Sequence, residues 1–229
     1  MELDEVMTAL EAEGTEQNRT AYARHGAHEP MFGVSHDALA ALERTIKTDH
    51  ELGLALWATG NHDARMLAAK VVDSDRFTAK LADSWVRDAD NHLVAGAVAD
   101  VVARSPVARS RSDAWRDRLG EWPASAGWGI VARTCEIEDE WTIAELRALL
   151  RQIEQEIHDR PNRVRHEMNM AVIAIALRNA ALQRQAMSAA RRIGTVDVDH
   201  GETNCTTPDA VEYIDKTVGY RHRRAVRSG

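Results

Sequence analysis

Apolar residues recur along this chain with the spacing of an α-helix, and alternation with a period of two is nearly absent. Asn, Asp, Ser and Thr precede many of the apolar segments, and Gly or Pro often follows them, as expected for helix caps and stops. Ser35, Asp49, Asn61, Thr78 and Thr142 are the clearest N-caps. The pattern predicts helices over 36–47, 50–59, 62–72, from 79 onward, and over 91–104, 109–119, 125–135, 143–158, 162–181 and 182–193.

Loops of roughly two to six residues join these segments, and such short loops place consecutive helices antiparallel. The sequence therefore predicts an all-α fold, either a closed bundle or an α-solenoid of antiparallel helical hairpins. The spacing Leu54-x-x-Trp57 returns as Leu119-x-x-Trp122, 65 residues later. Two units of a ~33-residue repeat would give this offset. We therefore favour a solenoid with HEAT-like repeats.

The 229 residues are expected to form one domain, 1–229, by the usual relation of length to domain number. Residues 1–30 form its N-terminal helices. After Gly194 the helical pattern stops, and 195–208 is expected to be a non-helical capping loop. Thr207-Pro208-Asp209 then begins a short terminal helix, and 219–229 is a basic tail with Arg221, Arg223, Arg224 and Arg227.

No run approaches ~18 apolar residues, so we expect no membrane-spanning helix and no membrane partner. The acidic N-terminus has no apolar stretch of the kind found in secretory signals. Cys135 and Cys205 fit neither a disulfide framework nor a CxxC metal motif. These features predict a cytoplasmic protein.

The formal net charge of −7 argues against a generic nucleic-acid-binding protein, yet the charges are separated along the chain. Residues 1–59 hold eleven acidic and four basic residues, whereas 160–192 holds seven arginines and one acid, Glu167. Of the 29 basic residues all but four are arginine, whose guanidinium suits phosphate groups. A GC-rich genome could explain the excess of arginine over lysine, but it does not explain the separation by sign.

The predicted helix 162–181 is apolar on all sides in its second half, so neighbouring helices should enclose it. Its first half places Asn162, Arg165, His166 and Asn169 on one face. This polar strip is either a solvated helix start or a surface that faces a groove and meets phosphates.

The loop after Gly194 carries Asp197, Asp199, His200, Glu202 and Cys205, which are all metal-ligating residue types. Their spacing matches no known metal motif, and a loop rich in turn-forming residues explains them equally well. We therefore predict no metal and no cofactor. The chain has no nucleophile elbow and no glycine-rich phosphate loop.

Tryptophan is unusually frequent among the aromatic residues. Trp57, Trp85 and Trp115 have apolar neighbours and are expected in the core. Trp128 follows a turn through Pro123 and is expected to be partly exposed, where it could stack on a base.

Asp83, Asp88 and Asp90 lie close to Trp85 in the sequence. They either cap the following helix or present a carboxylate. A carboxylate there would stabilise the positive charge that develops on deoxyribose when a base departs.

Several segments together resemble the bacterial DNA alkylation repair proteins built of HEAT-like repeats, the AlkC/AlkD type of alkylpurine DNA glycosylase. The most specific is Leu54-x-x-Trp57-x-x-Gly60-x-x-x-Ala64-Arg65-x-Leu67-Ala68. The others are Phe32-Gly33-Val34, Trp85 with its trailing aspartates, Asn162-Arg163-Val164-Arg165, Met168-Asn169 and Val198-Asp199-His200-Gly201. The resemblance covers roughly residues 22–216 and indicates a compact branch of that family.

This resemblance implies that duplex DNA binds in the concave face of the solenoid and that active members excise N3- or N7-alkylated purines. The family's catalytic aspartate falls on Gly96 here and its tryptophan on His92. Asp90 and Asp100 are the nearest carboxylates and are our candidate catalytic residues. The candidate DNA-binding residues are Trp128, Arg133, Arg163, Arg165, His166, Asn169 and Arg178.

The sequence thus leaves three functions open. The first is a DNA-binding repair protein that excises alkylated purines through a shifted carboxylate. The second is a non-catalytic relative that binds DNA of unusual structure. The third is a helical-repeat scaffold for a protein partner, which the acidic net charge favours.

Overall fold

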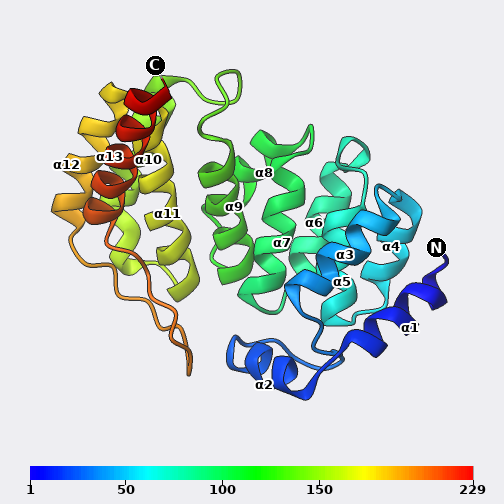
Figure 1. The fold of residues 1–229 in the computed structure, drawn as a ribbon. Coiled ribbons are helices and arrows are strands. Elements are labelled where there is room, and N and C mark those ends of the chain that lie inside the picture. Colours follow the sequence, from blue (N-terminus) through cyan, green and yellow to red (C-terminus); the bar gives the residue numbers. More distant parts are fainter. Residues whose placement is uncertain (229) are drawn as a thin grey trace. The chain divides into compact units, whose positions relative to one another are not determined.

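The computed structural model describes the backbone of residues 1–228 and the side chains of residues 1–221 and 223 (Figure 1). Over these residues the chain forms thirteen α-helices and two 3-10 helices, which confirms the all-α prediction. Gly14 and Val34 pair through an isolated antiparallel bridge.

The helices are α1 (Leu3–Glu13), α2 (Glu16–Arg24), α3 (His36–Ile46), α4 (His50–Ala58), α5 (His62–Val71), α6 (Ala79–Asp88), α7 (His92–Ala103), α8 (Ala108–Trp115), α9 (Glu121–Thr134), α10 (Ile143–Glu156), α11 (Asn162–Arg178), α12 (Ala180–Ile193) and α13 (Ala210–Ser228). The 3-10 helices are η1 (Ser74–Arg76) and η2 (Ile157–Asp159).

The chain divides into two compact units. Unit 1 comprises Met1–Asp113 with His200–Asn204, and unit 2 comprises Ala114–Asp199 with Cys205–Gly229. In unit 1, α5 packs against α3, α4 and α7, and α6 packs against α7. In unit 2, α11 packs against α9, α10, α12 and α13 (Figure 1). The consecutive helices α4 and α5, α6 and α7, and α11 and α12 therefore form hairpins, and non-consecutive pairs such as α5 and α7 or α9 and α11 also pack together.

The predicted N-caps are confirmed. The side chains of Ser35, Asp49, Asn61, Thr78 and Thr142 each accept a hydrogen bond from a backbone N–H in the first helical turn. Such a bond satisfies a donor that the helix itself leaves without a partner. These local signals were sufficient to place the starts of five helices.

Several helix boundaries differ from the prediction: α8, for example, ends at Trp115 rather than at Leu119. Asn179 accepts from the N–H groups of Ala181 and Leu182, so it caps α12 and α11 ends at Arg178. Helix α9 begins at Glu121 rather than at Ser125, because Pro123 lies in the first turn, where no intrahelical donor is required.

The terminal helix α13 is 19 residues long rather than short. Its backbone continues through the segment expected to be a basic tail. Of the tail arginines, the side chains of Arg224 and Arg227 lie outside the described residues.

The 65-residue offset between the two Leu-x-x-Trp motifs does not relate equivalent positions in two hairpins. Trp57 lies near the end of α4, whereas Trp122 lies in the first turn of α9 and Leu119 lies before that helix. The two motifs therefore occupy different places in their hairpins. Packing of apolar faces, rather than this motif, defines the repeating hairpins.

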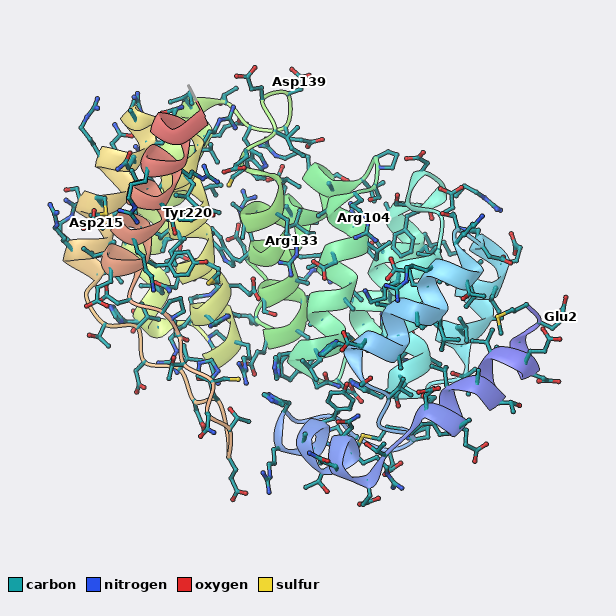
Figure 2. All side chains as sticks on the ribbon, viewed as in Figure 1. Glu2, Arg104, Arg133, Asp139, Asp215 and Tyr220 are labelled. Atoms are coloured by element: carbon teal, nitrogen blue, oxygen red, sulfur yellow. The ribbon has the colours of Figure 1, made fainter. Side chains whose placement is uncertain are left out.

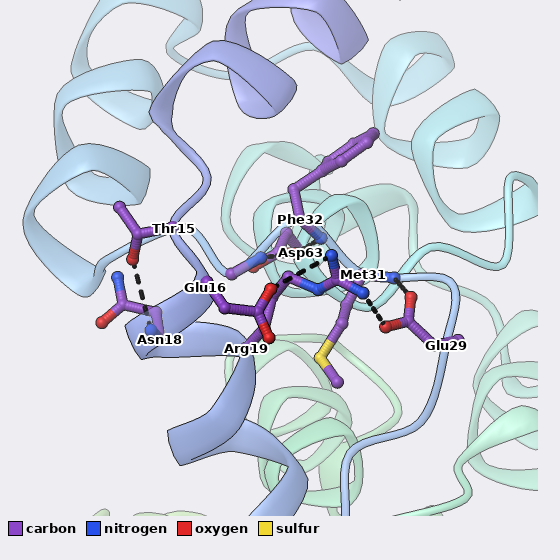
Figure 3. A network of polar contacts seen from close by, with 9 residues as sticks. Thr15, Glu16, Asn18, Arg19, Glu29, Met31, Phe32 and Asp63 are labelled. Atoms are coloured by element: carbon purple, nitrogen blue, oxygen red, sulfur yellow. Dashed lines mark hydrogen bonds and ion pairs between the residues drawn. The ribbon is translucent and has the colours of Figure 1, made fainter.

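A buried carboxylate organises unit 1. Asp63, fully buried at the start of α5, accepts hydrogen bonds from three consecutive backbone N–H groups (Figure 3). Its Oδ2 accepts from Phe32 (2.6 Å) and Gly33 (3.0 Å), and its Oδ1 accepts from Val34 (2.8 Å). Gly33 has a φ of 81°, and a Cβ there would lie 2.5 Å from the carbonyl oxygen of Thr15. The segment 32–34 is thus fixed between α2 and α5.

The tryptophans of unit 1 lie in the core, as predicted. Trp57 and Trp85 stack with ring centroids 3.9 Å apart and an interplanar angle of 4°, and Phe77 meets Trp85 edge-on. The indole N–H of Trp57 donates to Asp88 Oδ2 at 3.0 Å. Asp88 therefore satisfies a tryptophan donor, and Asn91 itself, rather than a preceding aspartate, caps α7.

We predict that Asp63→Ala lowers the free energy of unfolding by at least about 3 kcal/mol, because it leaves three N–H groups without their acceptor. Chemical denaturation measures this loss. Asp37→Ala, which removes an exposed carboxylate from the first turn of α3, is the control and should cost less than about 1 kcal/mol. If Asp63→Ala also lowered the free energy of unfolding by less than about 1 kcal/mol, the role given to the Asp63 carboxylate would be contradicted.

Candidate nucleic-acid interface

The polar strip on α11 holds the segment that follows α12. Asn162 exchanges two hydrogen bonds with the backbone of Asp199, donating from Nδ2 to its carbonyl (2.6 Å) and accepting from its N–H (2.7 Å). The Nδ1 atom of His166 lies 3.0 Å from the hydroxyl oxygen of Thr207, and Asn169 donates to the carbonyl of Pro208 at 2.9 Å. The polar strip therefore binds the segment that follows α12.

Two of the candidate DNA-binding residues are buried, and the expectation that Trp128 is partly exposed is wrong. Asn169 is 3% exposed and its amide serves Pro208. Trp128 is 0% exposed and lies within the core cluster of unit 2. Because α9 begins at Glu121, Trp128 lies inside a helix that packs along α11 rather than at the edge of a turn.

Arg178 also has a structural task. Its Nη1 donates to the carbonyls of Cys135 and Ile137, at the C-terminal end of α9, where carbonyl groups have no intrahelical partner. Burial raises the pKa of the adjacent Cys135 thiol to about 12, so this thiol stays protonated at neutral pH.

Arg163 and Arg165, at the start of α11, are half-buried. Burial lowers the pKa of Arg163, and Glu121, Cys205, Asp199 and Glu167 oppose that shift. Arg165 donates to Asn162 Oδ1 at 3.3 Å. Both guanidinium groups thus lie close to other side chains at the N-terminal end of α11.

A groove runs along α11 between α9 and α13, entirely within unit 2. Its volume is about 520 Å³, within the usual range for small-molecule sites. The floor is apolar and consists of side chains at helical spacing on α11: Met170, Ile173, Ala174 and Leu177. Tyr213 of α13, which is 44% exposed, forms one wall.

The polar part of the lining, the polar wall, consists of Arg133 on α9 and of His166 and Glu167, which lie one turn before Met170 on α11. Arg133 projects from α9 (Figure 2), and its Nη1 donates to the carbonyl of Gly129 at 2.9 Å. It lies 3.6 Å from Glu167 Oε2, with 31% of the Arg133 side chain and 22% of the Glu167 side chain exposed. The structure thus brings together two of the seven candidate DNA-binding residues.

The two candidate catalytic carboxylates lie in unit 1, and both are exposed. Asp90 accepts from the side-chain amide of Asn91 at 2.7 Å. Asp100 borders a second cleft, of about 340 Å³, with Glu43, Lys70 and Arg104. Nine of the ten residues from Asn91 to Asp100 lie in α7, and nine helical residues span roughly 13 Å, so the two carboxylates lie on different turns. At Gly96, between them, an added Cβ would meet no atom within 4 Å.

Among the described residues, no three His, Cys, Asp or Glu side chains come together in a way that could hold a metal ion. The loop residues Asp199, His200, Glu202 and Cys205 therefore form no such group. Likewise, no helix in the described part of the chain is long and apolar enough to span a membrane.

Comparison with known proteins identifies the family. The model of the family described as DNA alkylation repair enzyme matches residues 6–214. The chain belongs to this DNA alkylation repair family. The match covers both units and includes the groove on α11.

Relatives and a solved structure agree with this assignment. Two uncharacterized proteins, Lin0241 of Listeria innocua and Lmo0209 of Listeria monocytogenes, are each 26% identical over 220 residues, covering 93% of this chain and 96% of each relative. A solved structure is 28% identical, with a TM-score of 0.88 over 96% of this chain and 95% of that chain. It is described as a new family of proteins related to the HEAT-like repeat DNA glycosylases, with affinity for branched DNA structures. The predicted fold of HEAT-like helical repeats is thereby confirmed.

We predict that Asn162→Ala loosens the segment 195–209, because both hydrogen bonds to Asp199 are lost. Amide hydrogen exchange of this segment should become about tenfold faster, as a loss of about 1–2 kcal/mol of local stability implies. Gln155→Ala, an exposed change on α10, is the control and should leave the exchange unchanged. Equal protection in both variants would show that Asn162 does not hold the segment.

Proposed function

We propose that this protein binds branched DNA and does not excise bases. The observation that carries this proposal is the likeness, over nearly the whole chain, to a structure whose family has affinity for branched DNA structures. The contact surface that we propose is the face of unit 2 formed by α9, α11 and α13, where Arg133 and His166 border the groove. Arg221 adds a guanidinium whose side chain is 54% exposed.

The charge distribution supports specific rather than general binding. A protein of net charge −7 is repelled by phosphates over most of its surface, so contact is expected only where basic groups gather. Arg160 and Arg178 donate to backbone carbonyls and Arg192 pairs with Glu154 at the surface, and these contacts lower the number of guanidinium groups that can neutralise phosphates. Shape should therefore contribute more to recognition than total charge.

We expect the protein to bind a four-way junction at least about tenfold more tightly than a linear duplex of the same length, and both affinities to fall with salt. Arg133→Gln should weaken junction binding and reduce the slope of log affinity against log salt by about one, since one phosphate contact is lost. Fluorescence anisotropy at three salt concentrations measures both effects.

Arg184→Gln, which removes an exposed guanidinium of the same arginine-rich segment from α12, is the matched control. It should leave the slope unchanged. Equal binding of junction and duplex, or no binding of either, would refute the proposed function. A normal slope in Arg133→Gln would move the contact surface away from the groove.

Excision of alkylated purines is the second candidate, because the chain belongs to the DNA alkylation repair enzyme family. Asp90 or Asp100 would then stabilise the charge that develops on the sugar. Since both carboxylates are exposed, water weakens any such stabilisation. We therefore expect no release of 7-methylguanine from alkylated DNA above the rate without protein. Release that disappears in Asp90→Asn or Asp100→Asn would establish excision instead.

A further inference from the structure

We propose that the groove on α11 holds a single unpaired nucleobase of the branched DNA. This inference rests on the proposed function and adds to it the chemical group that is recognised. A nucleobase is a flat body with two apolar faces and an edge of hydrogen-bond donors and acceptors. The groove presents the complement of both features.

The apolar part of the groove suits the faces of a base. Four aliphatic or thioether side chains of α11 make the floor, and the ring of Tyr213 stands beside them, 44% exposed. The neighbouring residue Ile214 is fully buried, and Asp209 accepts from the N–H of Glu212 at the start of α13. Because these contacts fix the helix, the tyrosine is held in place before any ligand arrives, and stacking on it costs little ordering.

The polar wall suits the edge of a base. Arg133 offers guanidinium donors and Glu167 offers carboxylate acceptors, and the two groups lie 3.6 Å apart at the side of the floor. A wholly apolar ligand would displace water from both groups and could not replace the hydrogen bonds that this water makes with them. A base supplies acceptors to the first and donors to the second. The groove therefore favours a base over an aliphatic ligand.

Positive groups flank the groove along the direction of α11. Arg133 stands beside it, and Arg221 donates to the carbonyl of Leu177, the last floor residue, and pairs with Glu136 at 3.3 Å. The side chain of Arg221 remains 54% exposed. A nucleotide in the groove would thus have the Arg221 guanidinium near one of its phosphates, while Arg133 faces the base, and single-stranded sites combine stacking with charge in this way.

Only an unpaired base can enter. In a duplex, both faces of a base are stacked and its pairing edge is occupied, so neither the floor nor the polar wall could reach it. Branch points supply nucleotides that are already unstacked, which removes most of the energy required to expose the base. The groove therefore gives a physical reason for a preference for branched over linear DNA.

The test uses a three-way junction with one unpaired guanine at the branch, and the same junction with an abasic site in its place. The wild-type protein should bind the first about tenfold more tightly, as one stacked base implies. Tyr213→Ala should bind both junctions equally, whereas Tyr213→Phe should keep the difference because its ring still stacks. Thermal unfolding should show that both variants fold, since Tyr213 is partly exposed.

Tyr220→Ala is the matched control, because Tyr220 lies on the same helix (Figure 2), is 60% exposed and does not line the groove. It should keep the difference between the two junctions. Equal binding of both junctions by the wild-type protein would overturn the groove as a base site while leaving branched-DNA binding intact. A difference that survives Tyr213→Ala, or disappears in Tyr220→Ala, would also overturn it. Failure of the wild-type protein to prefer a junction over a duplex would instead refute the proposed function.

Discussion

The hydrogen bonds between α11 and the segment 195–209 are the constraint on which the groove depends. An amide buried on α11 requires a partner, because leaving it without one costs about 1–3 kcal/mol. Asn169 finds that partner in the carbonyl of Pro208, one residue before Asp209, which accepts a hydrogen bond in the first turn of α13. The bond therefore fixes where α13 begins, and with it the position of Tyr213. One face of α11 thus serves twice: its polar end anchors the returning chain, and its apolar end forms the floor of the groove that this chain encloses.

This double use explains what the sequence could and could not predict. Helix starts were predictable because a capping side chain lies within three residues of the backbone N–H that donates to it, as at Ser35 and Asn61. The periodicity of α11 also predicted a helix enclosed by neighbours. The polar strip was located correctly but its partner was not, because Thr207 and Pro208 lie about forty residues further along the chain. No local signal distinguishes a strip that faces solvent from one that faces a distant loop.

The burial of an individual site residue likewise depends on contacts that are distant in the sequence. Trp128 was expected at the edge of a turn, yet a helix that begins four residues earlier places it in the core of unit 2. Gly127 shows why that start is possible: a Cβ there would lie 2.5 Å from the backbone nitrogen of Arg116, so only glycine permits this approach of α9 to the preceding chain. Tyr213, which the sequence analysis did not select, belongs to the groove only because α13 folds back onto α11. Its alternation with the buried Ile214 is the one signal that could have marked it as an outward-facing aromatic residue.

The number of arginines in 160–192 overstates how many are available to contact phosphates. Of the seven arginines in 160–192, Arg160 donates to the carbonyls of Arg116 and Arg118, Arg178 serves the end of α9, and Arg192 pairs with Glu154. A guanidinium has five donors in a rigid fork, so it suits exposed carbonyls at helix ends as well as it suits phosphates. Non-specific attraction to DNA scales with the number of phosphates neutralised. An acidic protein in which some of the arginines make such contacts therefore gains little from duplex DNA in general. Whatever affinity it has must come from a few well-placed groups, and such groups discriminate between DNA structures because they contribute only where the geometry of the ligand matches theirs.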